Sequence, residues 1–159
     1  MLVTLTILVL SALLPVQDPG EVIPAFLDSI MADNTGAAMD MLSSRAIGDA
    51  DSVLANHPRQ VDAMLAFFGL SNAIRESASC GAELLEGILG SPSLKAGILL
   101  MGLAPGPPVQ SGDDMYVPVE YGLPGARDTL FFQLVTEEGR WRIRDFFDDA
   151  PEVPGLPRG

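Results

Sequence analysis

The segment from Leu130 to Phe147, LFFQLVTEEGRWRIRDFF, constrains the fold of this chain more than any other. On both sides of Glu138 and Gly139 apolar residues alternate with polar ones, and this period of two is typical of a half-buried β-strand. Glu138-Gly139 is a compact turn between the two patterned segments. The segment therefore predicts a β-hairpin.

Counting back from the turn predicts the cross-strand pairs Thr136–Trp141, Leu134–Ile143, Phe132–Asp145 and Leu130–Phe147. In this register Trp141, Ile143 and Phe132 share one buried face, and Asp145 lies in the same apolar row. The opposite face carries Arg142 and Arg144, with Arg140 at the turn. We expect a solvated face balanced by nearby acidic residues, and a specific anion site is the alternative.

Upstream of this hairpin, apolar residues recur at intervals of three and four, which is typical of helices. Helices are predicted over about 22–31, 38–44, 57–68 and 72–89. Pro24 is expected near the first turn of the first helix, and Pro58 in the first turn of the third, after a cap at Asn56 or His57.

The period changes at Gly90-Ser91-Pro92, which predicts a boundary between a helical half and a strand half. LKAGILLMGL, residues 94–103, is predicted as the first strand, and PGPPVQSGDD, residues 105–114, as a turn-rich loop. DMYVPVEYGL, residues 114–123, is a further strand in which Pro118 indicates an edge position or a bulge. We therefore expect an α+β fold with N-terminal helices packed on a curved, mainly antiparallel C-terminal sheet.

The size and charge of the chain limit its class. A chain of 159 residues with 48% hydrophobic and 19% charged residues fits one globular domain with a core of its own. The net charge of -12 repels the phosphates of nucleic acids and anionic membrane surfaces, so we expect no nucleic-acid partner.

The first residues form an apolar run from Leu2 to Leu14 that ends in a Pro- and Gly-containing stretch. A bilayer span needs about 20 apolar residues, whereas the core of a signal peptide needs about 7 to 15. Residues 1–17 are therefore predicted to be a signal peptide, which implies an exported (periplasmic or extracellular) protein without a stable membrane span. The alternative is a buried N-terminal helix or strand.

Cys80 is the only cysteine, so it cannot form a disulfide within the chain. We interpret it as a small buried apolar residue. The alternative is a bridge between two copies, which leaves a homodimer open.

Two stretches resemble the nuclear-transport-factor-2-like superfamily: FLDSIMADNTGAAMDMLS, residues 26–43, and LFFQLVTEEGRWRIRDFF, residues 130–147. The resemblance covers residues 22–148 and leaves a Pro/Gly-rich tail at 149–159. It implies a cone-shaped α+β domain with a hollow between the curved sheet and the helices. Enzymes of the superfamily keep an acid or base and a hydrogen-bond donor in that hollow.

The residues expected to line this pocket are Phe132, Tyr121, Trp141, Ile143 and Asp145. A carboxylate beside an apolar cavity acts as a general acid or base when desolvation raises its pKa, which makes Asp145 the catalytic candidate. The alternative is structural, with Asp145 accepting hydrogen bonds from the backbone or from an arginine. His57 is interpreted as a residue at a helix start.

One histidine and one cysteine do not build a zinc site of ordinary spacing, and no phosphate-binding glycine motif occurs, so no metal and no cofactor are predicted. Two functions remain. The first is an exported non-catalytic module that binds a small apolar ligand or an envelope protein. The second is an isomerase- or dehydratase-like enzyme that uses Asp145.

Overall fold

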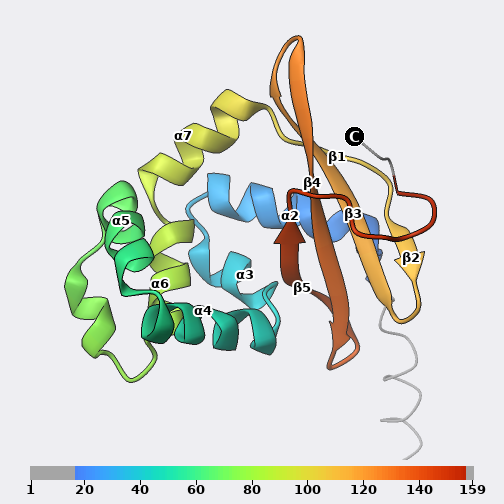
Figure 1. The fold of residues 1–159 in the computed structure, drawn as a ribbon. Coiled ribbons are helices and arrows are strands. Elements are labelled where there is room, and N and C mark those ends of the chain that lie inside the picture. The colour runs from blue at the N-terminus through green and yellow to red at the C-terminus, as the bar shows by residue number, and fades with distance from the viewer. Residues whose placement is uncertain (1–16, 157–159) are drawn as a thin grey trace, which may run out of the picture.

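The computed structural model describes residues 17–156 and has the predicted α+β architecture, with helices followed by a curved antiparallel sheet (Figure 1). Except for Gln17, the predicted signal peptide lies outside the described residues. The helices are α2 (Pro19–Met31), α3 (Thr35–Asp40), α4 (Ser44–Asn56), α5 (Pro58–Phe68), the 3-10 helix η1 (Asn72–Glu76), α6 (Cys80–Leu89) and α7 (Pro92–Met101). The strands are β1 (Ala104–Pro105), β2 (Val109–Ser111), β3 (Asp114–Leu123), β4 (Ala126–Glu137) and β5 (Arg140–Phe147).

The sheet has the order β1-β3-β4-β5, and β2 pairs with β3 on the same side as β1. All these strand pairs are antiparallel. In Figure 1 the sheet stands on one side and α4, α5 and α6 on the other, with α2 and α3 between them. Helix α7 runs above from the helical side toward the sheet.

The core consists of two clusters. The larger one packs the apolar side of α2 and α3 against the sheet, and it contains Val22, Ile23, Phe26, Ile30, Ala38, Leu89, Val117, Val119, Leu134 and Ile143. The smaller one lies among the helices and contains Val61, Leu65 and Leu84. Because α6 supplies Leu84 to one cluster and Leu89 to the other, this helix joins the two parts.

Helix α2 begins earlier than the sequence predicts. The Asp18 carboxylate accepts a hydrogen bond from the Gly20 N–H at 2.9 Å, and Pro19 follows as the first helical residue. Pro24 therefore lies inside the helix instead of near its first turn. Pro24 is exposed, so its ring lies on the solvent side of the helix and away from the core.

The predicted first strand, residues 94–103, is wrong, because this segment forms helix α7. Ser91 caps the helix by accepting a hydrogen bond from the Leu94 N–H at 3.2 Å, Pro92 occupies the first turn, and Gly102 ends it with a φ of 58°. Leu94 and Ile98, four residues apart, pack against the larger core cluster. The change from helix to strand thus falls at Gly102 and not at Gly90-Ser91-Pro92.

Two further helical predictions need correction. Helix α4 was not predicted; it contains no fully buried residue, but Val53 and Leu54 pack partly buried against the smaller core cluster. The single helix expected over 72–89 is divided into η1 and α6, which are separated by Ser77, Ala78 and Ser79. Serines favour such breaks because their hydroxyls compete for backbone hydrogen bonds.

Pro118 lies in an inner strand and not at an edge or bulge. The Pro118 carbonyl accepts a hydrogen bond from the Gly106 N–H at 2.7 Å. Since N–H and C=O of one strand residue point to the same side, the Pro118 nitrogen faces the stretch that separates β1 from β2. The hydrogen bond that Pro118 cannot donate is therefore on the side of this irregular stretch, at the end of β1, and not on the side of β4, which explains how an inner strand accommodates proline.

Within residues 17–156, no single helix combines the length and apolar character needed to cross a membrane. Helices α6 and α7 meet these criteria only when taken together, across a bend of 51°.

Candidate functional site

The hairpin of β4 and β5 forms one wall of the candidate site. Its turn is confirmed, with positive φ at Glu138 (52°) and Gly139 (74°), as a two-residue hairpin turn requires. The pairs Thr136–Trp141 and Leu134–Ile143 are also confirmed. Ile143 and Leu134 belong to the larger core cluster, and Trp141 and Phe132 pack against it, so the predicted buried face exists.

Beyond Ile143 the predicted register is wrong. Leu134 pairs with Ile143 but Gln133 pairs with Asp145, so Arg144 is an extra residue at a β-bulge. The bulge moves every later residue to the opposite face, and Phe132 opposes Phe146 instead of Asp145. The larger apolar residue takes the helix-facing position, which avoids directing a carboxylate toward apolar surroundings.

Asp145 is consequently exposed on the outer side of the hairpin. Its Oδ1 accepts a hydrogen bond from the Phe146 N–H at 2.8 Å. Within residues 17–156 it makes no ion pair and no hydrogen bond to another side chain. Its cross-strand neighbour Gln133 is buried and donates a hydrogen bond to Asp114 at 2.6 Å.

Phe146 is exposed although it lies on the helix-facing side of the sheet. Its side chain is 61% accessible, whereas Ile143, on the same face, is only 4% accessible. The Phe146 ring centroid lies 6.0 Å from that of Phe132, with the rings tilted by 36°. The helices therefore cover this face of the sheet at Ile143 but leave it open at Phe146.

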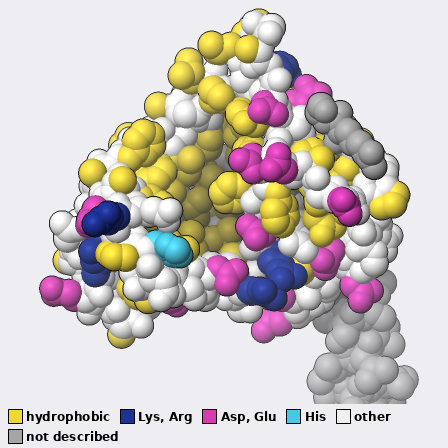
Figure 2. All heavy atoms as spheres, viewed as in Figure 1, with side chains coloured by type: hydrophobic (Ala, Val, Ile, Leu, Met, Phe, Trp, Pro, Cys, Tyr) yellow, Lys and Arg dark blue, Asp and Glu magenta, His cyan; other side chains and the backbone are white. Residues whose placement is uncertain are grey.

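Figure 2 shows a hollow in this part of the molecule, with hydrophobic side chains on its walls. Comparison with Figure 1 places the hollow between the sheet at β5 and the helices α4, α5 and α7. Two of these helices carry large exposed apolar side chains, Phe67 on α5 and Leu99 and Leu100 on α7. We refer to this space as the apolar hollow.

Tyr121 lies on β3 opposite Asp128 of β4 and is half-buried. Burial first, and then the negative charges of Asp128 and Asp148, raise the pKa of Tyr121 above the ordinary value. Its hydroxyl therefore keeps its proton, and with it the capacity to donate a hydrogen bond, at neutral pH.

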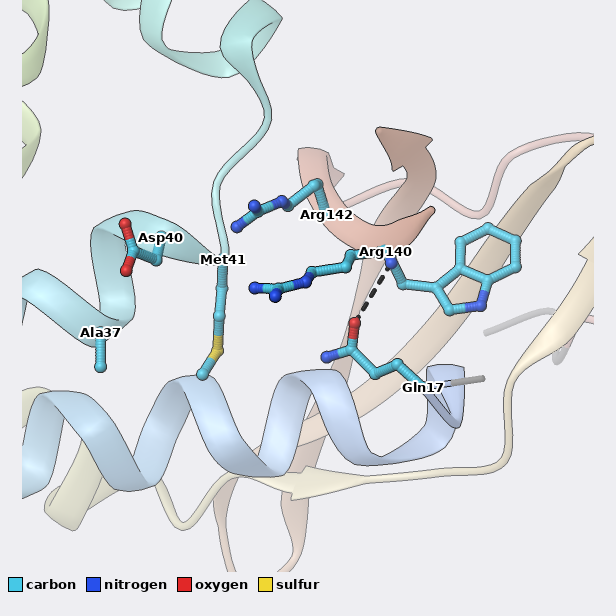
Figure 3. A pocket seen from close by; sticks show the side chains of 7 residues that line it. Gln17, Ala37, Asp40, Met41, Arg140 and Arg142 are labelled. Atoms are coloured by element: carbon cyan, nitrogen blue, oxygen red, sulfur yellow. Dashed lines mark hydrogen bonds between the residues drawn. The ribbon is translucent and has the colours of Figure 1, made fainter. Parts of the chain in front are cut away.

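A separate pocket of about 250 Å³ lies at the outer edge of β5, the strand that ends the sheet (Figure 3). It is lined by Gln17, Ala37, Asp40, Met41, Arg140, Trp141 and Arg142. In Figure 3 the side chains of Arg140 and Arg142 extend side by side toward α3, which carries Asp40. The sequence indicated an anion site at these arginines only as an alternative and did not reveal the other residues of the pocket, because the lining comes from three separate segments of the chain.

Backbone contacts fix the wall of this pocket. The Ile143 N–H donates to the Met41 carbonyl at 2.7 Å, and the Ser43 N–H donates to the Ile143 carbonyl at 2.8 Å. The Trp141 N–H donates to Oε1 of Gln17 at 3.2 Å. These hydrogen bonds attach the edge of β5 to the residue before α2 and to the residues that follow α3.

The remaining candidates have structural surroundings. His57 is an exposed residue before α5, and its side chain makes no capping hydrogen bond. Cys80 is half-buried, and its Sγ donates to Oδ1 of Asp51 at 3.2 Å, so it is not simply a buried apolar residue. The hydrogen bond to Asp51 and then desolvation raise the pKa of the Cys80 thiol, which keeps it in the less reactive protonated form.

In the described part of the chain, no three His, Cys, Asp or Glu side chains converge as metal ligands. The comparisons with protein-family models, curated proteins and solved structures give no match for this chain.

Proposed function

We propose that this chain is an exported, non-catalytic module that resembles nuclear-transport-factor-2-like proteins and binds a small apolar ligand in the apolar hollow. The observation that carries the proposal is Phe146, a phenylalanine on the helix-facing side of the sheet that no helix covers. An apolar segment of an envelope protein is the other occupant that the same chemistry accepts.

The free energy available from this contact is modest. Covering a fully exposed Phe side chain is worth about 1.5–3 kcal/mol, so covering the accessible part of Phe146 contributes on the order of 1 kcal/mol. The neighbouring apolar walls add to this when a ligand fills the concave space, since a concave site covers a ligand on several sides. An apolar molecule therefore gains more binding free energy in the hollow than on a convex surface.

The alternative of an isomerase- or dehydratase-like enzyme depends on a carboxylate in the hollow. Asp145 is exposed on the opposite face and accepts a hydrogen bond from the neighbouring backbone. No specific contact of Asp145 favours catalysis, so we retain the binding module as the proposed function. Export rests on the apolar run in residues 2–14, and the binding proposal does not depend on it.

A neutral apolar fluorophore, N-phenyl-1-naphthylamine, tests the proposal by titration against the folded protein. We expect saturable fluorescence enhancement with wild-type protein and about fivefold weaker binding with Phe146→Ser, because about 1 kcal/mol of contact is lost. Asp145→Asn is the matched control on the adjacent residue and the opposite face, and we expect it to bind as the wild type does.

Circular dichroism of each variant verifies that the fold is retained. Absence of saturable binding, or equal affinity of wild type and Phe146→Ser, contradicts the proposal. Isomerase or dehydratase turnover that disappears in Asp145→Asn would favour the enzyme instead.

A further inference from the structure

Four basic residues within residues 17–156 make no ion pair, namely Arg59, Arg140, Arg142 and Arg144, and two of them lie together at the edge of β5. Although acidic residues outnumber basic ones by 21 to 9, Arg140 and Arg142 make no ion pair within residues 17–156. Four other basic residues do have acidic partners: Arg45 with Asp49, Arg75 with Asp62, Lys95 with Asp33 and Arg127 with Glu120. Two guanidinium groups thus stay without a counter-charge within 4.0 Å in a strongly acidic molecule.

These two arginines share one pocket. They are two residues apart on β5, which places them on the same side of the strand, and Figure 3 shows both extending toward α3. Arg142 is half-buried, which strengthens its charge interactions relative to those of a fully hydrated arginine. Like charges repel, so this arrangement is stabilised when an anion lies between or beside the two groups.

The other walls define what kind of anion fits. Asp40 contributes a carboxylate from α3, and Met41 and Ala37 contribute apolar surface. Among the residues that line the pocket, two guanidinium groups and one carboxylate give a net charge of +1, which one carboxylate of a ligand neutralises; Glu137, the cross-strand neighbour of Arg140, does not line the pocket, and its carboxylate accepts hydrogen bonds from Ser44. A phosphate dianion would instead leave an excess negative charge in a molecule whose net charge is already -12.

We propose that the pocket at the edge of β5 binds the carboxylate of a small polar molecule, with Arg140 and Arg142 donating hydrogen bonds to its oxygens. Arginine suits this task because its planar group donates parallel hydrogen bonds to a carboxylate. A volume of about 250 Å³ is below the range of about 300–1,000 Å³ typical of sites for drug-sized ligands, so the ligand has the size of an amino acid. Asp40 then accepts a hydrogen bond from a donor group on the same molecule.

A second pocket of about 390 Å³ provides a contrast. It lies beside β1 and is lined largely by proline, glycine and alanine, with Glu120 as its charged residue. Arg127 Nη1 already binds Glu120 Oε2 at 3.2 Å. This larger pocket therefore offers no unpaired charge for a polar ligand, and the pocket at the edge of β5 offers two.

Trp141 provides the fluorescence signal for a test, because it lines the pocket and is the only tryptophan of the chain. N-acetylglycine, its neutral analogue N-acetylglycinamide and inorganic phosphate are titrated at constant ionic strength while Trp141 fluorescence is recorded. We expect a saturable change with N-acetylglycine and none with N-acetylglycinamide, since only the former carries the carboxylate.

Two variants show whether the change in Trp141 fluorescence comes from binding in this pocket. Arg142→Gln is expected to weaken N-acetylglycine binding at least tenfold, whereas Arg144→Gln, on the same strand but not lining the pocket, leaves it unchanged. An equal response to the amide, an unchanged affinity in Arg142→Gln, or no saturable response overturns the proposal. Tighter binding of phosphate than of N-acetylglycine overturns the assignment to a carboxylate.

Discussion

At the scale of single residues, the extra residue Arg144 decides what β5 presents to the helices. Without the bulge, Asp145 would lie in the apolar row of β5, opposite Phe132. With the bulge, the carboxylate reaches solvent and Phe146 takes the inward position. The bulge thus places a phenylalanine, and not a carboxylate, on the helix-facing side of β5.

The same strand offers a test of which residues face the core. Ile143 is 4% accessible, and a carboxylate there has no partner, so Ile143→Asp loses several kcal/mol of a total stability near 5–15 kcal/mol. We expect this variant to lose cooperative unfolding. Arg142→Ser, one residue earlier on the opposite face, is expected to change stability by less than about 0.5 kcal/mol. Thermal unfolding measures both variants. Equal melting temperatures would show that Ile143 does not face the core as described.

At the scale of secondary structure elements, the contact between α4 and α6 depends on one glycine. The Gly81 N–H at the start of α6 donates to Oδ1 of Asp51 at 2.6 Å. A Cβ at position 81 would lie 2.6 Å from the same oxygen and 2.7 Å from the Asp51 nitrogen. Only glycine permits this approach, because any side chain would push the two helices apart.

Two glycine substitutions test this contact. Gly81→Ala is expected to lower the free energy of unfolding by about 1–3 kcal/mol, because overpacking shifts the backbone of α4. Gly97→Ala, inside α7 with no atom within 4 Å of the new Cβ, is expected to raise it by about 0.5–1 kcal/mol. Chemical denaturation compares the two, and a Gly81→Ala variant as stable as the wild type would refute the close packing of α4 and α6.

The elements differ in how well the sequence predicts them. Helices α2 and α5, strand β3 and the β4–β5 turn carry strong periodicity and clear turn residues, and all were predicted. The apolar run of α7 is compatible with both a strand and a helix, and the Ser91-Pro92 start and the Gly102 end were the deciding signals.

The site was less predictable than the fold. The alternation of apolar and polar residues along β5 was enough to predict that Trp141 and Ile143 share one face. The bulge at Arg144 depends on packing along the whole hairpin, and alternation does not reveal it. The pocket of Arg140 and Arg142 also includes Gln17 and Asp40, which are separated from these arginines by about a hundred residues or more in the sequence. No local pattern contains that information.

At the scale of the whole molecule, two partly independent cores surround a space that neither fills. One core joins α2 and α3 to the sheet, and the other lies among α4, α5 and α6. Helix α7 extends above this space (Figure 1), and hydrophobic side chains line it (Figure 2). Large exposed apolar surfaces are uncommon on monomeric proteins and commonly mark binding sites. The central claim is therefore that the apolar hollow is open and binds apolar molecules at Phe146.

The most direct test of this claim is to locate a bound apolar molecule by nuclear magnetic resonance. With N-phenyl-1-naphthylamine bound to the isotope-labelled protein, we predict intermolecular nuclear Overhauser effects from the probe to the ring protons of Phe146 and Phe132. Phe147, which follows Phe146 and pairs with Phe131 on the outer face, serves as the internal control. Contacts to Phe147 and Phe131 without contacts to Phe146 would contradict the account.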